Sequence, residues 1–211
     1  MEKMNRVEVI ESSLDRVFPN PKCELNYTKD YELLIAIVLS AQATDKSVNL
    51  VTPVLFTRYP TLEELKNANI EDIISIIRSI GTYNRKALYI KEIANILVSK
   101  YNGSVPRDRK SLESMPGVGR KVCNVFLSEW YHIPNIAVDT HVERVSKRLG
   151  LSKDSDNVLD VEKKLCKLFK KEDWSRRHLQ LVLFGRYICK SKKPLCSNCE
   201  FRDICKKKDL N

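Results

Sequence analysis

The sequence predicts an all-α protein, and three observations carry this prediction. Apolar residues recur at three- and four-residue intervals through most of the chain, as Val7, Ile10, Leu14 and Val17 do near the N-terminus. Gly, Pro and Asn fall at the ends of these segments, where helices stop. No segment shows the alternation of apolar and polar residues that a half-buried strand requires.

Length and composition fit a folded chain with a polyanionic partner. The 211 residues, 43 % of them hydrophobic, suffice for one large or two modest domains. The longest apolar run, 33–43, is far short of the roughly twenty residues that span a bilayer, and the N-terminus lacks a signal-peptide core. We therefore predict a cytoplasmic protein without a membrane segment, nucleoid-associated if its source is prokaryotic. The formal charge of +10 favours nucleic acid as partner, although a solvated basic surface would give the same charge.

The first helices are marked by prolines and capping residues. An N-terminal helix and a Pro-containing connection lead to a helix at about 30–43, which is apolar on nearly every face and therefore central. Thr44 or Asp45 can cap the next helix, in which Pro53 should cause a bend or a short break. Thr61 then begins a capping box.

The middle of the chain continues with helices that have clear ends. Asn69 can cap a helix that Gly81 stops, and a long amphipathic helix follows at about 85–101, ending at Asn102. Asp108 then caps a short helix.

The last helices lead to a cluster of cysteines. Gly119 starts one helix, and Asp139 starts another that Gly150 stops. Two further helices, at about 157–170 and 175–188, complete the predicted elements.

Between two of these helices lies a tight turn, Pro116-Gly117-Val118-Gly119. Its glycines can adopt positive φ and allow a foreign backbone to approach closely. The N–H groups of the turn and the N-terminus of the next helix then form an anion site. The turn resembles a helix-hairpin-helix motif, which holds DNA phosphates without reading sequence; the alternative is an ordinary helix connection. Gly117, Val118, Gly119 and Arg120 are thus the candidate DNA contacts of this turn.

Lys121 follows the turn directly. By itself a lysine in this place is more often a phosphate contact than a nucleophile. However, the first turn of a helix and the neighbouring Arg120 both disfavour the ammonium form, and a lysine that acts as a nucleophile needs the neutral amine.

Asp139 lies eighteen residues after Lys121. It is predicted to cap a helix, and a capping carboxylate that faces a cleft can also accept a proton or stabilise a developing sugar cation. His141, in contrast, is interpreted as a structural hydrogen-bonding residue.

Four of the seven cysteines form a C-x6-C-x2-C-x5-C pattern near the C-terminus. Four thiolates on a short loop suit a soft metal centre, either tetrahedral zinc or a four-iron cluster, whereas disulfides are disfavoured in a reducing cytosol. The spacing differs from the paired C-x2-C units of a zinc ribbon. The candidate ligands are Cys189, Cys196, Cys199 and Cys205, and the basic residues between the first two are Lys190, Lys192 and Lys193. The remaining thiols, Cys23, Cys123 and Cys166, are expected to be buried or half-buried.

These segments together resemble the endonuclease III family of DNA repair glycosylases. The resemblance rests on LSAQATD at 39–45, IGTYNRKA at 80–87, MPGVGRKVCNV at 115–125, IAVDTHVERVSKRLGL at 136–151 and the cysteine pattern. It implies two helical domains with a DNA cleft between them. A six-helix barrel-like domain would span 24–135, and the N-terminal helix, 1–23, would join 136–211 in a cluster domain with its 4Fe-4S loop at 189–205.

The resemblance also implies roles for individual residues. Lys121 matches the nucleophilic lysine of the family, Asp139 its catalytic aspartate, and Gln42 the residue that fills the gap left by an extruded nucleotide; the four cysteines match the ligands of a 4Fe-4S cluster. The implied partner is double-stranded DNA containing damaged pyrimidines or abasic sites, bound by a monomer. The implied reaction is base excision through a Schiff base on Lys121, followed by strand cleavage 3′ to the lesion by β-elimination.

Three positions depart from the family pattern. Thr82 replaces a leucine wedge, which leaves intercalation and opposite-base preference open, while Cys123 and Phe184 are interpreted as packing changes. Two alternatives remain at this point: a non-catalytic helix-hairpin-helix module, and a glycosylase with a different base preference.

Overall fold

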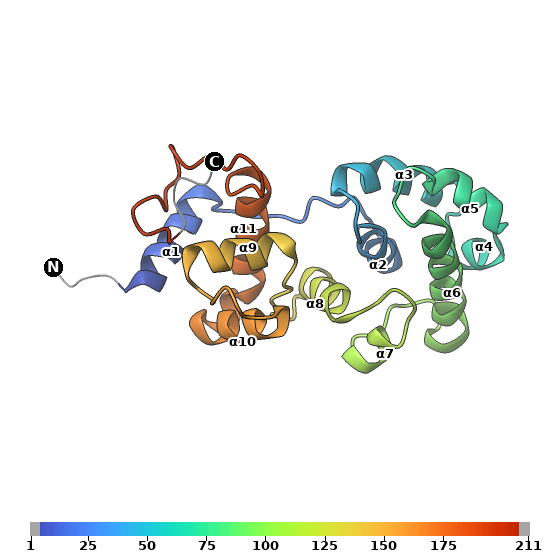
Figure 1. Ribbon diagram of the computed structural model, residues 1–211. Helices are drawn as coiled ribbons and strands as arrows, with labels where there is room; N and C mark the ends of the chain where they lie inside the picture. The colour runs from blue at the N-terminus through green and yellow to red at the C-terminus, as the bar shows by residue number, and fades with distance from the viewer. Residues whose placement is uncertain (1–4, 207–211) are drawn as a thin grey trace. The chain divides into compact units, whose positions relative to one another are not determined.

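The computed structural model describes residues 5–206, and every regular element in this range is helical (Figure 1). The all-α prediction is therefore confirmed. The helices are α1 (Arg6–Val17), α2 (Asp30–Leu39), α3 (Asp45–Arg58), α4 (Leu62–Asn67), α5 (Ile70–Ile77), α6 (Tyr83–Tyr101), α7 (Arg109–Glu113), α8 (Arg120–Glu129), α9 (Thr140–Leu149), α10 (Val158–Leu168), the short 3-10 helix η1 (Lys171–Asp173) and α11 (Trp174–Tyr187). Over this same range, no helix combines the length and the apolar character needed to cross a membrane.

The described chain divides into two compact units. Unit 1 is built from two separate segments, 5–23 and 132–206, and contains α1 and α9 to α11. Unit 2 is the continuous segment Glu24–Tyr131, with α2 to α8. The boundary drawn from the sequence, at 135/136, lies a few residues further along the chain.

The central element of unit 2 is α2. Every residue from Tyr31 to Leu39 is buried, as the apolar sequence predicted, and α2 packs against α3, α6 and α8. It ends at Leu39, earlier than the predicted 43. The helices α4 and α5 pack on the long helix α6. Unit 2 comprises the helices α2 to α8.

The capping residues of unit 2 lie where the sequence placed them. The side chains of Thr44, Thr61, Asn69 and Asp108 each accept a hydrogen bond from a backbone N–H in the first turn of the next helix. Of the two outcomes predicted for Pro53, a bend or a short break, the break is absent. The helix α3 continues past Pro53 without interruption and has buried residues on both sides of the proline.

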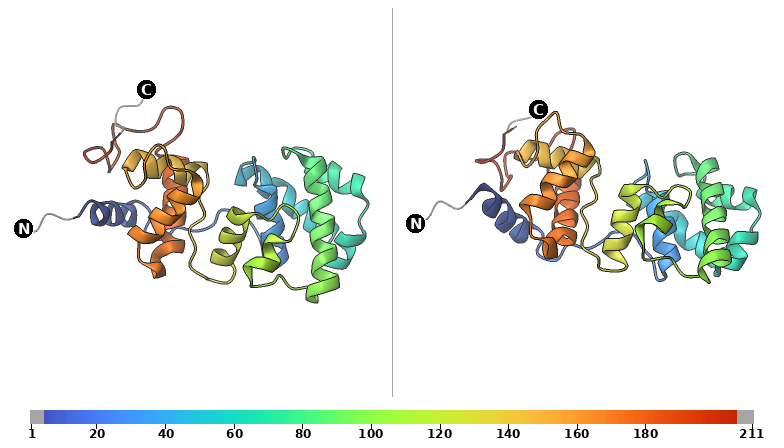
Figure 2. Two further views of the ribbon diagram at one scale, coloured as in Figure 1. Left: turned by 60° about the horizontal axis from the view of Figure 1, so that its bottom comes forward. Right: turned by 90° about the horizontal axis from the view of Figure 1, so that it is seen from below.

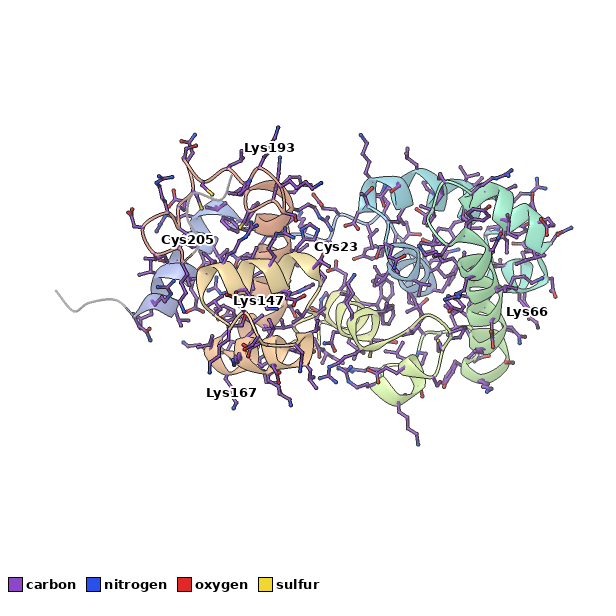
Figure 3. The ribbon with its side chains drawn as sticks, in the orientation of Figure 1. Cys23, Lys66, Lys147, Lys167, Lys193 and Cys205 are labelled. Atoms are coloured by element: carbon purple, nitrogen blue, oxygen red, sulfur yellow. The ribbon has the colours of Figure 1, made fainter. Side chains whose placement is uncertain are left out.

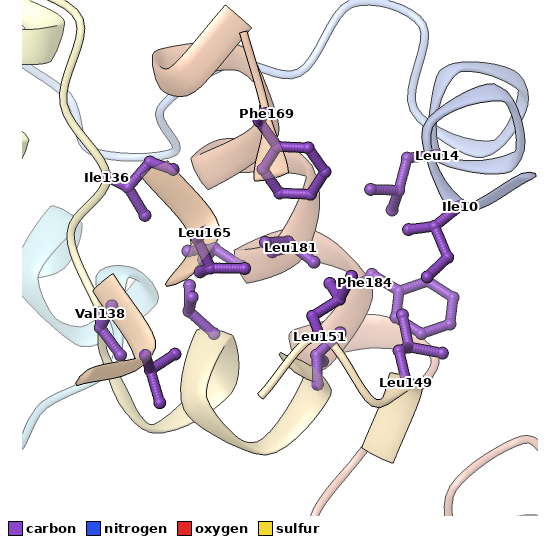
Figure 4. Close-up of a cluster of buried hydrophobic side chains, with 14 of the residues drawn as sticks. Ile10, Leu14, Ile136, Val138, Leu149, Leu151, Leu165, Phe169, Leu181 and Phe184 are labelled. Atoms are coloured by element: carbon purple, nitrogen blue, oxygen red, sulfur yellow. The ribbon is translucent and has the colours of Figure 1, made fainter. Parts of the chain in front are cut away.

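Unit 1 has an apolar core to which both of its chain segments contribute (Figure 4). Ile10 and Leu14 of α1 are fully buried and pack with residues of the last helices, including Leu165, Leu181 and Phe184. Figures 1 and 2 show α1 beside α11, and the two helices are in contact. The N-terminal helix is therefore an integral part of unit 1.

Polar contacts also join α1 to α11. The guanidinium of Arg177, only 5 % exposed, donates a hydrogen bond to Asp15 and another, of 2.9 Å, to Gln180 Oε1. Gln180 Nε2 in turn donates to Asp15 Oδ1 at 2.9 Å. Burial alone would raise the pKa of Asp15, but these hydrogen bonds and the charges of Arg177 and Arg176 outweigh it, so the pKa is lowered.

Candidate functional site

The predicted hairpin is a short turn between α7 and α8 in unit 2. Met115 N–H donates to the Leu112 carbonyl at 3.0 Å, and Val118 N–H donates to the Met115 carbonyl at 3.1 Å. The side chains of Leu112, Met115 and Val118 are buried. Because these residues fix the turn to the core of unit 2, its glycines are held in one conformation.

The two glycines of the turn serve different purposes. Gly117 has a φ of +76°, and a Cβ there would lie 2.7 Å from a ring carbon of Tyr89 and 3.1 Å from Val38, so only glycine fits. A Cβ on Gly119 would meet no atom within 4 Å. Gly119 is also the N-cap of α8 and offers no capping side chain. The positive end of α8 therefore opens onto free space, as an anion site requires.

Lys121 lies in the first turn of α8 and is half-buried. Within unit 2 its ammonium makes no hydrogen bond and no ion pair. The amine of Lys121 is thus a reactive group next to the turn that no partner within the unit holds.

The neighbouring thiol of Cys123 is fully buried, and burial raises its pKa, which fits the predicted core position.

Gln42 and Thr82 occupy two loops of unit 2. Both residues are exposed and both have left-handed backbones, with φ of +56° and +57°. A Cβ on Gly81 would lie 3.5 Å from the Gln42 carbonyl oxygen, so the two loops are neighbours. A β-branched residue with such a φ is uncommon and marks a conformation that its surroundings impose.

Asp139 is the N-cap of α9 in unit 1, as predicted. Its Oδ1 accepts hydrogen bonds from the N–H groups of His141 at 2.9 Å and Val142 at 2.8 Å. The second oxygen, Oδ2, makes no hydrogen bond within the described part of unit 1. His141 Nδ1 lies 3.1 Å from Arg144 Nη2, which matches the structural role expected for this histidine.

The four candidate cysteines follow α11 and line one small cavity together with Arg148, Phe184 and other residues. All four thiols are half-buried. Burial raises the pKa of Cys199, a hydrogen bond from the Phe201 backbone opposes this, and the other three cysteines raise it further by charge repulsion. The four thiols therefore lie within electrostatic reach of one another.

The donor set of four thiols fits a soft metal centre. A single ion needs its ligands to meet at one point, whereas a multi-atom cluster needs them around a volume. The thiols lie around a cavity, so the residues present fit the second arrangement.

The basic loop between Cys189 and Cys196 is held in place by side chains of α9. Arg148 Nη1 donates to the Lys190 carbonyl at 2.7 Å and lies 3.4 Å from Cys189 Sγ, and Arg144 Nε donates to the Cys189 carbonyl at 3.0 Å. The three loop lysines, Lys190, Lys192 and Lys193, are exposed, and Lys193 extends outward in Figure 3. Two arginines thus fix the backbone whose lysines face solvent.

The structure groups the predicted residues into two sets. Unit 2 carries Gln42, the glycine turn and Lys121, while unit 1 carries Asp139, the cysteines and the loop lysines. The sequence analysis missed three residues that support these loops: Arg144 and Arg148 of α9, and Lys86 of α6, which is only 3 % exposed. Lys86 shares the inner helical stripe with Ile90 and Ile93, and a lysine in an apolar stripe was the signal that could have revealed it.

The all-helical fold and the glycine turn define a helix-hairpin-helix protein. Residues 35–171 match the model of the HhH-GPD superfamily of base excision DNA repair proteins. The chain is 45 % identical over 206 residues to endonuclease III of Bacillus subtilis (strain 168), covering 96 % of this chain and 94 % of that one. It is 42 % identical over 209 residues to endonuclease III of Escherichia coli (strain K12), covering 99 % and 98 %.

A solved structure gives the same result. A trapped endonuclease III–DNA covalent intermediate, an estranged-adenine complex, is 46 % identical with a TM-score of 0.91 and covers 97 % of each chain. The chain therefore belongs to the endonuclease III family, and the resemblance seen in its sequence is confirmed.

Proposed function

We propose that this chain is a bifunctional DNA glycosylase and AP lyase of base excision repair, which removes oxidised pyrimidines from double-stranded DNA. The observation that carries the proposal is the amine of Lys121, which follows an open glycine turn at the N-terminus of α8 and has no partner within its unit. The family membership supports it, because a relative of 46 % identity has been trapped as a covalent intermediate with DNA.

The first step is binding and extrusion. The N–H groups around Gly117, Val118 and Gly119, with Arg120, hold the DNA backbone, and Lys190, Lys192 and Lys193 add phosphate contacts. The damaged nucleotide leaves the stack at a cost of about a few kcal/mol, which is least for a weakened pair. Gln42 fills the gap that the nucleotide leaves.

The second step is covalent. The neutral amine of Lys121 attacks C1′ of the deoxyribose, and the bond to the base breaks with its electron pair, so the base leaves and takes up a proton. Asp139 stabilises the positive charge that develops on the sugar and accepts a proton from the lysine. The sugar ring opens to a Schiff base, which acidifies the 2′ hydrogen. Loss of that proton expels the 3′ phosphate, and water finally releases the enzyme.

We propose further that Cys189, Cys196, Cys199 and Cys205 hold a 4Fe-4S cluster. The cluster would fix the shape of the basic loop, which Arg144 and Arg148 already anchor. The purified native protein should be brown and contain iron and sulfide in equal amounts. Elemental analysis and absorption spectroscopy measure this, and a colourless protein with one zinc per chain would contradict the assignment.

The domain division, oligomeric state and location complete the proposal. We propose that segments 1–23 and 136–211 form the cluster domain, that 24–135 is the domain with the hairpin, and that the protein acts as a monomer. We also propose that it works in the cytoplasm, because four of its cysteines are assigned to a metal centre, and thiols stay reduced in that compartment.

Borohydride trapping on DNA with an abasic site tests the central role of Lys121. The reagent reduces a Schiff base, so the native chain should form a covalent adduct and Lys121→Gln should form none. Lys110→Gln is a matched control, since Lys110 is an exposed lysine on the preceding helix α7. An undiminished adduct with Lys121→Gln would show that another amine is the nucleophile.

The same assay separates the alternatives. A non-catalytic hairpin module would bind DNA and give no adduct even with the native chain. A glycosylase of different preference would give adducts on other bases, which a panel of duplexes with defined oxidised pyrimidines and varied opposite bases would reveal.

A further inference from the structure

Lys86 has an unusual environment for a lysine. It lies near the start of α6, is 3 % exposed and is followed by the fully buried Ala87. Its ammonium donates two hydrogen bonds to backbone carbonyls, to Leu39 at 2.9 Å and to Ala41 at 2.6 Å. No carboxylate pairs with it within unit 2, so these carbonyls are its main support.

The position of those carbonyls explains why a charge is tolerated there. Leu39 is the last residue of α2, and the C-terminus of a helix carries the negative end of its dipole. Burial nevertheless lowers the pKa of Lys86. An apolar residue would fill the same space without that cost, so the contact with the loop after α2 is what distinguishes a lysine in this place.

The loop that Lys86 holds is the one that carries Gln42. Ala41 is one of the two acceptors and directly precedes Gln42, which is exposed with a φ of +56°. Thr82, also exposed and with a φ of +57°, precedes Lys86 by one helical turn in the neighbouring loop. The buried ammonium therefore holds the loop that carries Gln42, while the backbone N–H of the same residue donates to the Thr82 carbonyl at 3.1 Å.

We propose that Lys86 is a positioning residue for lesion recognition, which holds the Gln42 loop in the conformation that enters DNA. This proposal rests on the function proposed above and adds a residue to it. A loop that is already ordered loses less conformational entropy when it inserts, so the preference for DNA with a gap in its stack depends on the two hydrogen bonds of Lys86.

The test replaces Lys86 with methionine, which has similar length and no donor. The measured quantities are the affinities for a duplex with a tetrahydrofuran abasic analogue and for the undamaged duplex. Lys86→Met should weaken binding to the analogue by about tenfold or more, as small misplacements of functional groups do. Its binding to undamaged duplex should change by less than about twofold, because the phosphate contacts lie elsewhere.

A double substitution separates positioning from simple stabilisation. If Lys86 acts through Gln42, then Lys86→Met should cost no further affinity once Gln42→Ala is present. Lys91→Met is the matched control, since Lys91 lies on the same helix and donates to the carbonyl of Ala68, away from the Gln42 loop. This control should leave the preference for the analogue unchanged.

Each outcome decides the question. Three results would overturn the proposal. Lys86→Met could lower the affinity for the analogue equally with and without Gln42→Ala, it could lower the affinity for both duplexes equally, or it could leave the affinity for the analogue unchanged. If Lys86→Met does not fold, as judged by its circular dichroism, Lys86→Arg is measured instead. Its longer, branched side chain keeps the charge but must shift the two hydrogen bonds in this buried place, so the preference for the analogue should fall by less than about tenfold. An unchanged preference would overturn the proposal. A native chain without any preference for the analogue, and without a borohydride adduct, would instead refute the proposed function itself.

Discussion

Asp139 uses only one of its two carboxylate oxygens for structure. Oδ1 accepts both N–H groups at the start of α9, and Oδ2 is left without a hydrogen bond in the described part of its unit. A carboxylate fixed through one oxygen has a defined direction for the other, which suits a group that must accept a proton or face a cation.

We expect Asp139→Asn to keep the helix cap and to lose most of the single-turnover rate. The amide oxygen can still accept from His141 and Val142, so the free energy of unfolding should fall by less than about 1 kcal/mol. The negative charge is removed, so the single-turnover rate should fall about 10²- to 10⁴-fold while DNA affinity is retained. Quenched-flow cleavage and thermal unfolding measure the two effects.

Asp108→Asn is the control for this prediction, because Asp108 caps α7 in the same way. Its single-turnover rate should stay close to that of the native chain. A rate near the native one for Asp139→Asn as well would assign Asp139 a purely structural role.

The difference between Asp139 and Lys86 shows what could be predicted at the level of single residues. Asp139 bonds to residues two and three positions away, and such local contacts leave a pattern in the sequence. Lys86 bonds to carbonyls about 45 positions away, which have no side-chain signature at all. Family resemblance implied a catalytic role for Asp139 and gave none for Lys86.

At the level of elements, the loop that carries the four cysteines, residues 189–205 (the cysteine loop), is anchored by more than its thiols. Phe201, in the last part of the loop, is fully buried and packs edge-on against Phe184 with ring centroids 4.9 Å apart. Arg148 holds the other side through the carbonyls of Lys190 and Ser191. The loop is therefore fixed to α9 and α11 at two points.

We expect Arg148→Leu to loosen the basic loop. The loss of its hydrogen bonds leaves the Lys190 and Ser191 carbonyls without a protein donor from α9, so DNA affinity should fall about five- to tenfold. Iron release to a chelator should also accelerate, which absorbance would follow over time.

Lys147→Met is a matched control on the same helix. The substitution removes the same charge as Arg148→Leu, but Lys147 forms an ion pair with Glu143 at 2.6 Å and does not hold the basic loop. It should change neither affinity nor iron release appreciably. Equal effects of the two substitutions would show that charge alone, and not the anchoring of the loop, governs both properties.

Helix ends followed from the sequence wherever a local signal exists. Thr61 and Asn69 cap their helices as predicted, because capping depends on residues within one turn. The end of α2 at Leu39 could not be predicted in this way. The apolar run continues past Leu39 in the sequence, and the chain there is held by Lys86, which lies far along the chain. Pro53 likewise lies within a continuous helix, where tertiary packing on both sides overrides the local cost.

At the level of the whole molecule, the charge of +10 should make DNA binding strongly dependent on salt. The logarithm of the affinity should fall with the logarithm of salt concentration by roughly 0.9 for each neutralised phosphate. Replacing Lys190, Lys192 and Lys193 by Gln should reduce the slope by roughly 2.7 if each contacts one phosphate. Fluorescence anisotropy at several salt concentrations measures this.

A triple replacement of Lys163, Lys167 and Lys170 by Gln changes the net charge by the same amount. These exposed lysines lie on or just after α10, outside the candidate site. The slope of this control should stay close to the native value. Equal reductions in both triple variants would indicate that binding responds to total charge and not to the cysteine loop.

The discontinuous composition of unit 1 has a consequence for the synthesis of the protein. The ribosome makes α1 before its packing partner α11, and all of unit 2 lies between them along the chain. At roughly 5–20 residues per second, Ile10 and Leu14 would wait roughly 10 to 30 s for the helices that bury them, while the continuous unit 2 can fold as it emerges. The helix α1 is thus translated well before the helices that bury it, and it is among the last parts of unit 1 to reach its native contacts.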